Sequence, residues 1–293
     1  MRRVPRFAAL LFLLAAGPLA AAGPAGHAAL DAAIKLFEGK RYPDAQVALE
    51  RIVAAEPGNA RACYHLGRTL ELRADAAALP EAVKWLQQAA QLEPQNSTYL
   101  GRYGGASLLF AERTNSLFAA RRGRDAMEQA IRLNPADLEA REGLFQFYQR
   151  TPWPLGSSAK AADHLQAIRQ RDPTRAGVIA ILSRRQARDY AGAFRLCEQA
   201  LAGRPDDYNA LYQLGGTALE SGEQLGRGVA AFEQCLTLEP PTPASPSPSV
   251  VWQRLGAIHE KRGHPDAARA AYAAALRLDS GNREAAAARA ILK

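Results

Sequence analysis

The chain has 293 residues, and its 37 Lys and Arg against 29 Asp and Glu give a formal net charge of +8. This charge is mild for the length, and no basic run alternates with aromatic residues, so the composition disfavours a nucleic-acid-binding protein. An odd count of three Cys argues against a disulfide-rich scaffold. We expect Cys63, Cys197 and Cys235 to be buried free thiols within helices, with a Cys197–Cys235 bridge as the alternative.

Residues 1–22 have the features of a secretory signal peptide. Three arginines in the first six residues precede an apolar run, 7–16, that is too short to span a bilayer as a stable anchor. Ala20 and Ala22 then form the small pair of a cleavage site. We expect a mature chain that begins at Gly23, with an uncleaved N-terminal anchor as the alternative.

A four-residue turn pattern with Pro in second place recurs along nearly the whole chain. Its copies are 56–59, 93–96, 134–137, 172–175, 204–207 and 239–242, and a seventh copy at 279–282 has lost the Pro. The prolines are 32 to 41 residues apart. A period of this size predicts a solenoid of stacked helix pairs, in which Pro follows the second helix and the next Asn or Asp caps the following one.

The early repeats differ in how clearly they can be aligned. Repeat one is degenerate, whereas repeat two has small and apolar residues at the spacing of one helix face, at Cys63, Leu66, Gly67 and Leu70 and again at Ala82, Leu86 and Ala89. A small residue such as Gly67 lets the two helices of a pair approach closely. Repeat three leaves two frames open, with this position at Gly101 or at Gly104.

Two segments interrupt the pattern. Residues 151–158 lie between the helices of repeat four and contain two Pro and a Gly, which exclude a helix. Trp153 in this insertion either packs against the stack, which we favour, or stays exposed for a partner. Residues 240–249 are rich in Pro and Ser and predict an extended connector that tethers repeat seven with some slack.

The last repeat is the clearest. Counted from Ser249, its residues at positions 4, 7, 8, 11, 15, 20, 24, 27 and 32 are Trp252, Leu255, Gly256, His259, Gly263, Ala268, Tyr272, Ala275 and Ser280. This resembles the tetratricopeptide repeat, in which Trp, Leu, Gly and Tyr open the first helix and Pro closes the second. His259 departs from the family's Tyr and Ser280 from its Pro.

The resemblance implies an all-α fold, a right-handed α-solenoid of about seven antiparallel helix pairs with a C-terminal capping helix. We divide the chain into the signal peptide 1–22, repeats one to six at 23–239, the linker 240–249, and repeat seven with the capping helix at 250–293.

Signals for catalysis are missing from the sequence. It contains no G-x-S-x-G, no H-E-x-x-H and no Walker loop. His259 and His264 flank one turn but lack a third metal ligand. We therefore expect a protein that is not an enzyme and needs no metal or cofactor.

The resemblance also implies a concave groove lined by the first helix of each pair. Carried over by position, the candidate partner-binding residues are Arg61, Tyr64, Arg68, Glu71, Glu142, Gln146, Tyr212 and Gln253. Their polar and aromatic character suits an extended peptide or a protein surface. The alternative is that each side chain is only part of a solvated face.

The sequence therefore predicts a non-catalytic protein–protein interaction scaffold in the bacterial periplasm, with secretion as the second choice. Its partner is a protein or peptide, and no membrane span remains after signal cleavage. The alternative is a structural assembly factor for an envelope complex that uses its convex face or its Pro-rich insertion.

Overall fold

The computed structural model describes residues 24–73, 76–152, 154–243 and 245–292, which form 15 α-helices, one short 3₁₀ helix (Ala76–Ala78) and no strand. The first helices of the pairs, here called A helices, are α1 (Pro24–Glu38), α3 (Ala60–Leu72), α5 (Ser97–Thr114), α7 (Leu138–Arg150), α9 (Pro173–Gln186), α11 (Tyr208–Ser221) and α13 (Pro248–Lys261). The second helices, here called B helices, are α2 (Tyr42–Ala55), α4 (Leu79–Leu92), α6 (Leu117–Leu133), α8 (Ser158–Arg171), α10 (Tyr190–Gly203), α12 (Leu225–Cys235) and α14 (Pro265–Leu278).

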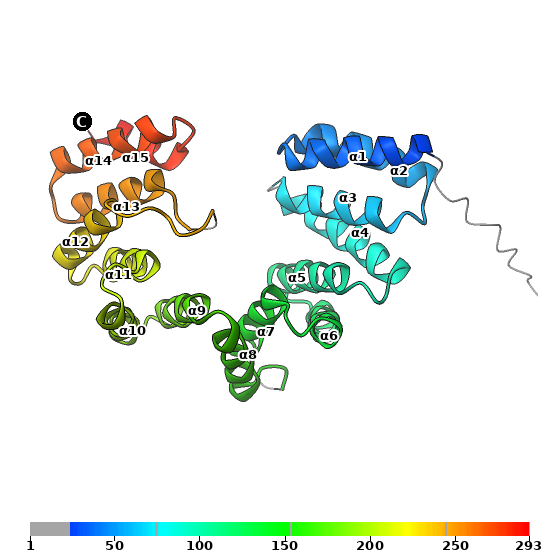
Figure 1. The fold of residues 1–293 in the computed structure, drawn as a ribbon, viewed down its shortest axis with the longest axis horizontal. Coiled ribbons are helices and arrows are strands. Elements are labelled where there is room, and N and C mark those ends of the chain that lie inside the picture. Colours follow the sequence, from blue (N-terminus) through cyan, green and yellow to red (C-terminus); the bar gives the residue numbers. More distant parts are fainter. Residues whose placement is uncertain (1–23, 74–75, 153, 244, 293) are drawn as a thin grey trace, which may run out of the picture. The chain divides into compact units, whose positions relative to one another are not determined.

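These seven pairs and a final helix, α15 (Arg283–Ile291), confirm the predicted all-α solenoid within the described residues (Figure 1). The predicted signal peptide and Trp153 lie outside them.

The chain divides into two compact units, the first ending at Ala140 and the second starting at Arg141. In unit 1, α1 pairs with α2, α3 with α4 and α5 with α6, and α2 and α4 also contact the A helix that follows them. In unit 2 the same holds for α9 with α10, α11 with α12 and α13 with α14, and α15 covers α14. Each unit therefore buries its apolar residues between neighbouring helices.

The turn residues cap the helices as the sequence predicts. Each side chain accepts a hydrogen bond from a backbone N–H in the first turn that follows; the six are Asn59, Asn96, Asp137, Asp172, Asp207 and Asn282. Asp172 differs because it precedes its proline, so Pro173 opens α9 instead of closing the turn. Proline suits this place, since the first helical residue needs no N–H. Asp137, Asp172 and Asp207 are consequently evenly spaced, although the neighbouring prolines are not.

Glycine positions set the closest contacts inside the pairs. A Cβ on Gly67 would lie 2.7 Å from Cγ of Leu86, and a Cβ on Gly256 would lie 2.6 Å from the Tyr272 ring. A Cβ on Gly104 would lie 2.5 Å from Cγ of Met127 in α6. Gly104 therefore holds the close-approach position of repeat three, which settles the choice between the two frames.

One recurring contact was not predicted from the sequence. A Gln at the same place in three B helices donates its side-chain N–H to the carbonyl of the Pro in the preceding turn. The pairs are Gln88 with Pro57 (2.9 Å), Gln129 with Pro94 (3.2 Å) and Gln234 with Pro205 (3.0 Å). Each bond satisfies a carbonyl that the helical hydrogen bonds leave without a partner, and it ties one repeat to the next.

The Pro- and Ser-rich connector does not leave repeat seven slack, which corrects that expectation. The hydroxyl of Tyr208 donates to the Pro246 carbonyl at 2.5 Å. Helix α13 begins at Pro248, and its buried Val251, Leu255 and Ile258 share one core with α11 and α12. The packing of α13, not the linker, fixes repeat seven on repeat six.

All three Cys are free and buried, as predicted. Burial raises the pKa of the Cys63 thiol to about 11 and those of Cys197 and Cys235 to about 12. These thiols stay protonated near neutral pH and are poor nucleophiles, because the thiolate is the reactive form.

Candidate partner-binding surface

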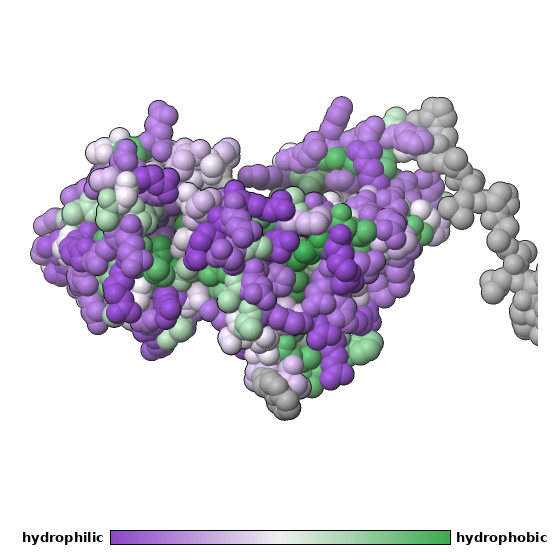
Figure 2. All heavy atoms as spheres, turned by 60° about the horizontal axis from the view of Figure 1, so that its bottom comes forward, coloured by the Kyte–Doolittle hydropathy of each residue, from purple (hydrophilic) through white to green (hydrophobic). Residues whose placement is uncertain are grey.

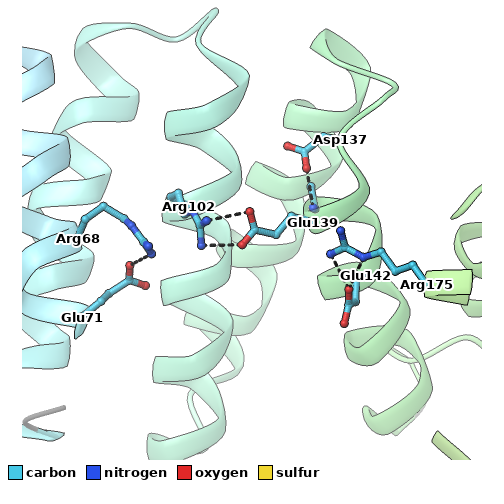
Figure 3. Close-up of polar contacts among 8 residues, drawn as sticks. Arg68, Glu71, Arg102, Asp137, Glu139, Glu142 and Arg175 are labelled. Atoms are coloured by element: carbon cyan, nitrogen blue, oxygen red, sulfur yellow. Dashed lines mark hydrogen bonds and ion pairs between the residues drawn. The ribbon is translucent and has the colours of Figure 1, made fainter. Parts of the chain in front are cut away.

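The A helices place a row of polar side chains on one face of each unit, called here the A-face. Neighbouring A helices are joined there by side-chain contacts between one repeat and the next. In unit 1, Asp31 of α1 meets Arg61 of α3 at 3.2 Å. Arg102 of α5 forms a bidentate pair with Glu139 of α7, at 2.7 and 2.8 Å (Figure 3).

Arg68 and Glu71 form a less exposed pair within α3. Their charged atoms lie 2.7 Å apart, and each side chain is only 16% exposed. Burial raises the pKa of Glu71, although Arg68 and Arg102 act in the opposite direction. Removing Arg68 would leave the Glu71 carboxylate poorly solvated, so the pair has a structural role as well as any role in binding.

Aromatic side chains of α3 also contact the neighbouring A helices. Tyr64 of α3 stacks on Tyr99 of α5, with ring centroids 4.8 Å apart, and meets the edge of the His65 ring. His65 also packs against Phe37 of α1. Burial, with help from Arg61 and Arg68, lowers the pKa of His65 to about 4. His65 is therefore neutral near pH 7, and the positive charge of this region comes from its arginines.

Unit 2 carries a similar row on its A-face. Glu142 of α7 accepts two hydrogen bonds from Arg175 of α9, at 2.7 and 3.0 Å (Figure 3), and one from Gln146 at 3.5 Å. Arg185 of α9 pairs with Glu220 of α11 and donates to Gln213 at 2.7 Å. The hydrogen bond that Glu220 accepts from Arg185 is the main reason that the pKa of Glu220 is lowered.

The last two predicted residues are also engaged. Tyr212 of α11 packs against the core, with its ring centroid 5.7 Å from that of Phe232. Gln253 of α13 donates to Glu284 of α15 at 2.5 Å. All eight predicted residues thus lie on A helices and contact neighbours, four of them together on α3. Whether any of them binds a partner stays a prediction.

Sequence reasoning missed Tyr99, Arg102, Arg175 and Arg185, which complete the two rows. They lie in repeat three, for which two frames were open, and in repeat five, where Pro173 opens the helix and the proline spacing therefore misplaces the frame. The caps supply the missing signal: counted from Asn96 and Asp172, these repeats align with repeat two. Arg185 and Glu220 then occupy the same place after their caps, Asp172 and Asp207.

The described residues hold no group of three His, Cys, Asp or Glu side chains that could bind a metal. None of their helices is both long and apolar enough to cross a membrane. The face of the molecule drawn in Figure 2 is largely hydrophilic, with separate hydrophobic areas. The A-face therefore offers alternating charges, amides and half-buried aromatics, which suit contact with a polypeptide.

Comparisons with known proteins agree with this architecture. The family model described as tetratricopeptide repeat matches residues 249–282. These bounds coincide with the frame counted from Ser249 in the sequence. No curated protein matches the chain.

Among solved structures, a tetratricopeptide repeat protein from Parabacteroides merdae ATCC 43184 is 15% identical to the chain. The alignment covers 92% of this chain and 98% of that one, with a TM-score of 0.58. PilW, a type IV pilus biogenesis factor, is also 15% identical over 91% of this chain and 99% of its own, but with a TM-score of 0.45. The chain thus contains a tetratricopeptide repeat at residues 249–282 and has the fold of a tetratricopeptide repeat protein.

Proposed function

We propose that this protein is a non-catalytic scaffold of the cell envelope that binds a protein or peptide along its A-face. Repeat proteins of this class generally act as non-enzymatic scaffolds for protein partners. The observation that carries the proposal is the row of side-chain contacts that joins A helices of consecutive repeats, by ion pairs such as Arg102–Glu139 and Arg175–Glu142 and by the Tyr64–Tyr99 stack. These contacts hold the side chains in place before a partner arrives, which lowers the ordering cost of binding.

Not every residue of the row is a clean probe of binding. Arg68 supports the half-buried Glu71, and Tyr64 and Tyr212 pack against the cores. Arg61 is better, because its side chain is 53% exposed and its ion pair with Asp31 is solvated. Such an exposed pair contributes only about 0–1 kcal/mol to stability, so its loss leaves the fold intact.

We expect Arg61→Ala to weaken partner binding by about 1–2 kcal/mol, or roughly five- to thirty-fold, because Arg is a frequent hot-spot residue. The partner is first captured from an envelope extract on the immobilised protein and identified by mass spectrometry. A binding isotherm and a melting curve are then recorded for each variant. Lys84→Ala in α4 is the control, since Lys84 is exposed on a B helix.

Equal binding by the wild type, Arg61→Ala and a Gln146→Ala variant would contradict an A-face site. If deletion of 242–248 abolished binding instead, the partner would contact the Pro-rich segment. That result would support the alternative function, a structural assembly factor that uses this insertion.

The envelope location is part of the proposal, and the N-terminal sequence supports it. We expect protein isolated from the periplasm to begin at Gly23, which an intact-mass measurement would detect. A periplasmic or cytoplasmic protein that still carried residues 1–22 would contradict export with cleavage.

A further inference from the structure

The third helix pair is longer than its neighbours. Helices α5 and α6 have 18 and 17 residues, whereas α3 and α4 have 13 and 14. The extra length lies at the loop end, because Gly67 and Gly104 stand at the same place after their caps, Asn59 and Asn96. From these glycines α5 continues to Thr114, five residues more than α3 has beyond Gly67. At 1.5 Å per residue, α5 reaches about 7.5 Å farther.

The projecting end carries exposed apolar side chains. Leu117 and Phe118, the first residues of α6, are 65% and 68% exposed. Leu109 of α5 is also exposed. Gly104 of α5 faces Gly123 of α6 across the antiparallel pair. Leu109 lies five residues after Gly104 and Phe118 five residues before Gly123, so both lie the same distance from these glycines toward the loop. These three residues therefore lie at one end of the hairpin, here called the α5–α6 tip.

The charge around the tip is positive. Arg113 and Arg121 are exposed, and no ion pair joins either of them to another described residue. Arg122 lies over the Phe118 ring at 5.0 Å. Of the acidic residues nearby, Asp125 is paired with Arg124 at 2.6 Å, and Glu112 has a contact of its own. The exposed apolar residues are thus flanked by two exposed arginines, Arg113 and Arg121, that form no ion pair with another described residue.

The positive charge favours one kind of surface as the partner of the tip and disfavours another. A second copy of the chain docked through the same tip would bring Arg113 and Arg121 of both copies together, which is unfavourable. An anionic bilayer complements both features, since its phosphates attract arginines and its acyl region accepts Leu and Phe. Arg121 lies one helical turn below Leu117, so its guanidinium can stay at headgroup depth while the leucine inserts.

We propose that the α5–α6 tip is a peripheral membrane anchor that binds anionic lipid surfaces. Leu117 and Phe118 enter the interface, and Arg113 and Arg121 contact lipid phosphates. The anchor goes beyond the proposed scaffold function and does not depend on it, because it uses different residues from the A-face.

The test is flotation of the full-length protein with vesicles of phosphatidylcholine alone or of equal parts phosphatidylcholine and phosphatidylglycerol. We expect binding to the anionic vesicles about tenfold or more above that to the neutral ones, and salt should weaken it. The double variants Leu117→Ser/Phe118→Ser and Arg113→Gln/Arg121→Gln should each lose most of this binding. Ile291→Ser is the matched control, because it removes an exposed apolar residue of α15.

Melting curves are recorded to establish that the variants fold. We expect them to fold, because the substituted side chains are exposed. The proposal is overturned if wild-type protein binds neither vesicle, or if both tip variants bind as the wild type does. It is also overturned if sedimentation of the lipid-free protein shows a dimer that Leu117→Ser/Phe118→Ser converts to a monomer, because the tip would then be a contact between copies.

Discussion

Gly104→Ala is expected to lower the free energy of unfolding by about 2 kcal/mol. The added methyl would lie 2.5 Å from Cγ of Met127 and 2.8 Å from the carbonyl oxygen of Gly123. Met127 can change rotamer, but the Gly123 oxygen belongs to the backbone of α6, so the two helices must move apart. The helix preference of Ala over Gly offsets about 1 kcal/mol of this cost. Urea unfolding followed by circular dichroism measures the difference.

Gly101→Ala is the matched control, because it makes the same change one turn earlier on the same helix. Its methyl would lie 3.4 Å from the Asp137 carboxylate and 3.8 Å from Cβ of Ala130, which are ordinary contacts. We expect the Gly101 variant to match or slightly exceed wild-type stability. The opposite ranking of the two variants would show that repeat three is packed in the other frame, with Gly101 at the helix contact.

Arg185→Ala is expected to destabilise unit 2 by about 2 kcal/mol, because it removes a buried guanidinium and the hydrogen bond that the buried Gln213 side chain accepts from it. The Arg185 side chain is only 9% exposed. It donates to Gln213 at 2.7 Å and to Glu220 at 2.9 Å, and it lies against Gly216. Its removal leaves the buried Gln213 amide without this donor. It also removes the side-chain contacts from Arg185 of α9 to Gln213 and Glu220 of α11.

Arg184→Ala tests whether the burial of Arg185 is the reason for the expected loss of stability. Arg184 is the preceding residue and also forms an ion pair, with Asp189 at 2.9 Å, but its side chain is 57% exposed. We expect its loss to change stability by about 0–1 kcal/mol, as for other solvated pairs. Equal melting temperatures for the two variants would mean that the Arg185 contacts contribute no more than a surface pair.

Much of the fold was predictable because it depends on residues close together in the sequence. A cap such as Asn59 acts on a backbone N–H three residues away, and a proline ends a helix wherever it falls. The face of a helix follows from a period of 3.6 residues. Together with the resemblance of the last repeat to the tetratricopeptide pattern, these local rules predicted about seven helix pairs, a capping helix, and the frame of residues 249–282.

The candidate surface was only partly predictable. Family positions placed Tyr64 and Arg68 on α3, but not their packing against Tyr99 and Glu71, which gives them a structural role. Arg175 and Arg185 were missed because Pro173 opens its helix instead of preceding the cap, which shifted the apparent frame of repeat five.

The sequence by itself therefore determined the repeat, its helices and their caps, since each follows from neighbours along the chain. Only the tertiary structure decided between Gly101 and Gly104, because both sit on the same helix and only the approach of Met127 distinguishes them. It also decided that α13 packs firmly on α11 and α12 despite the Pro-rich linker. In both cases the deciding contacts join different helices, and the shape complementarity of the packed side chains is not encoded in any local pattern.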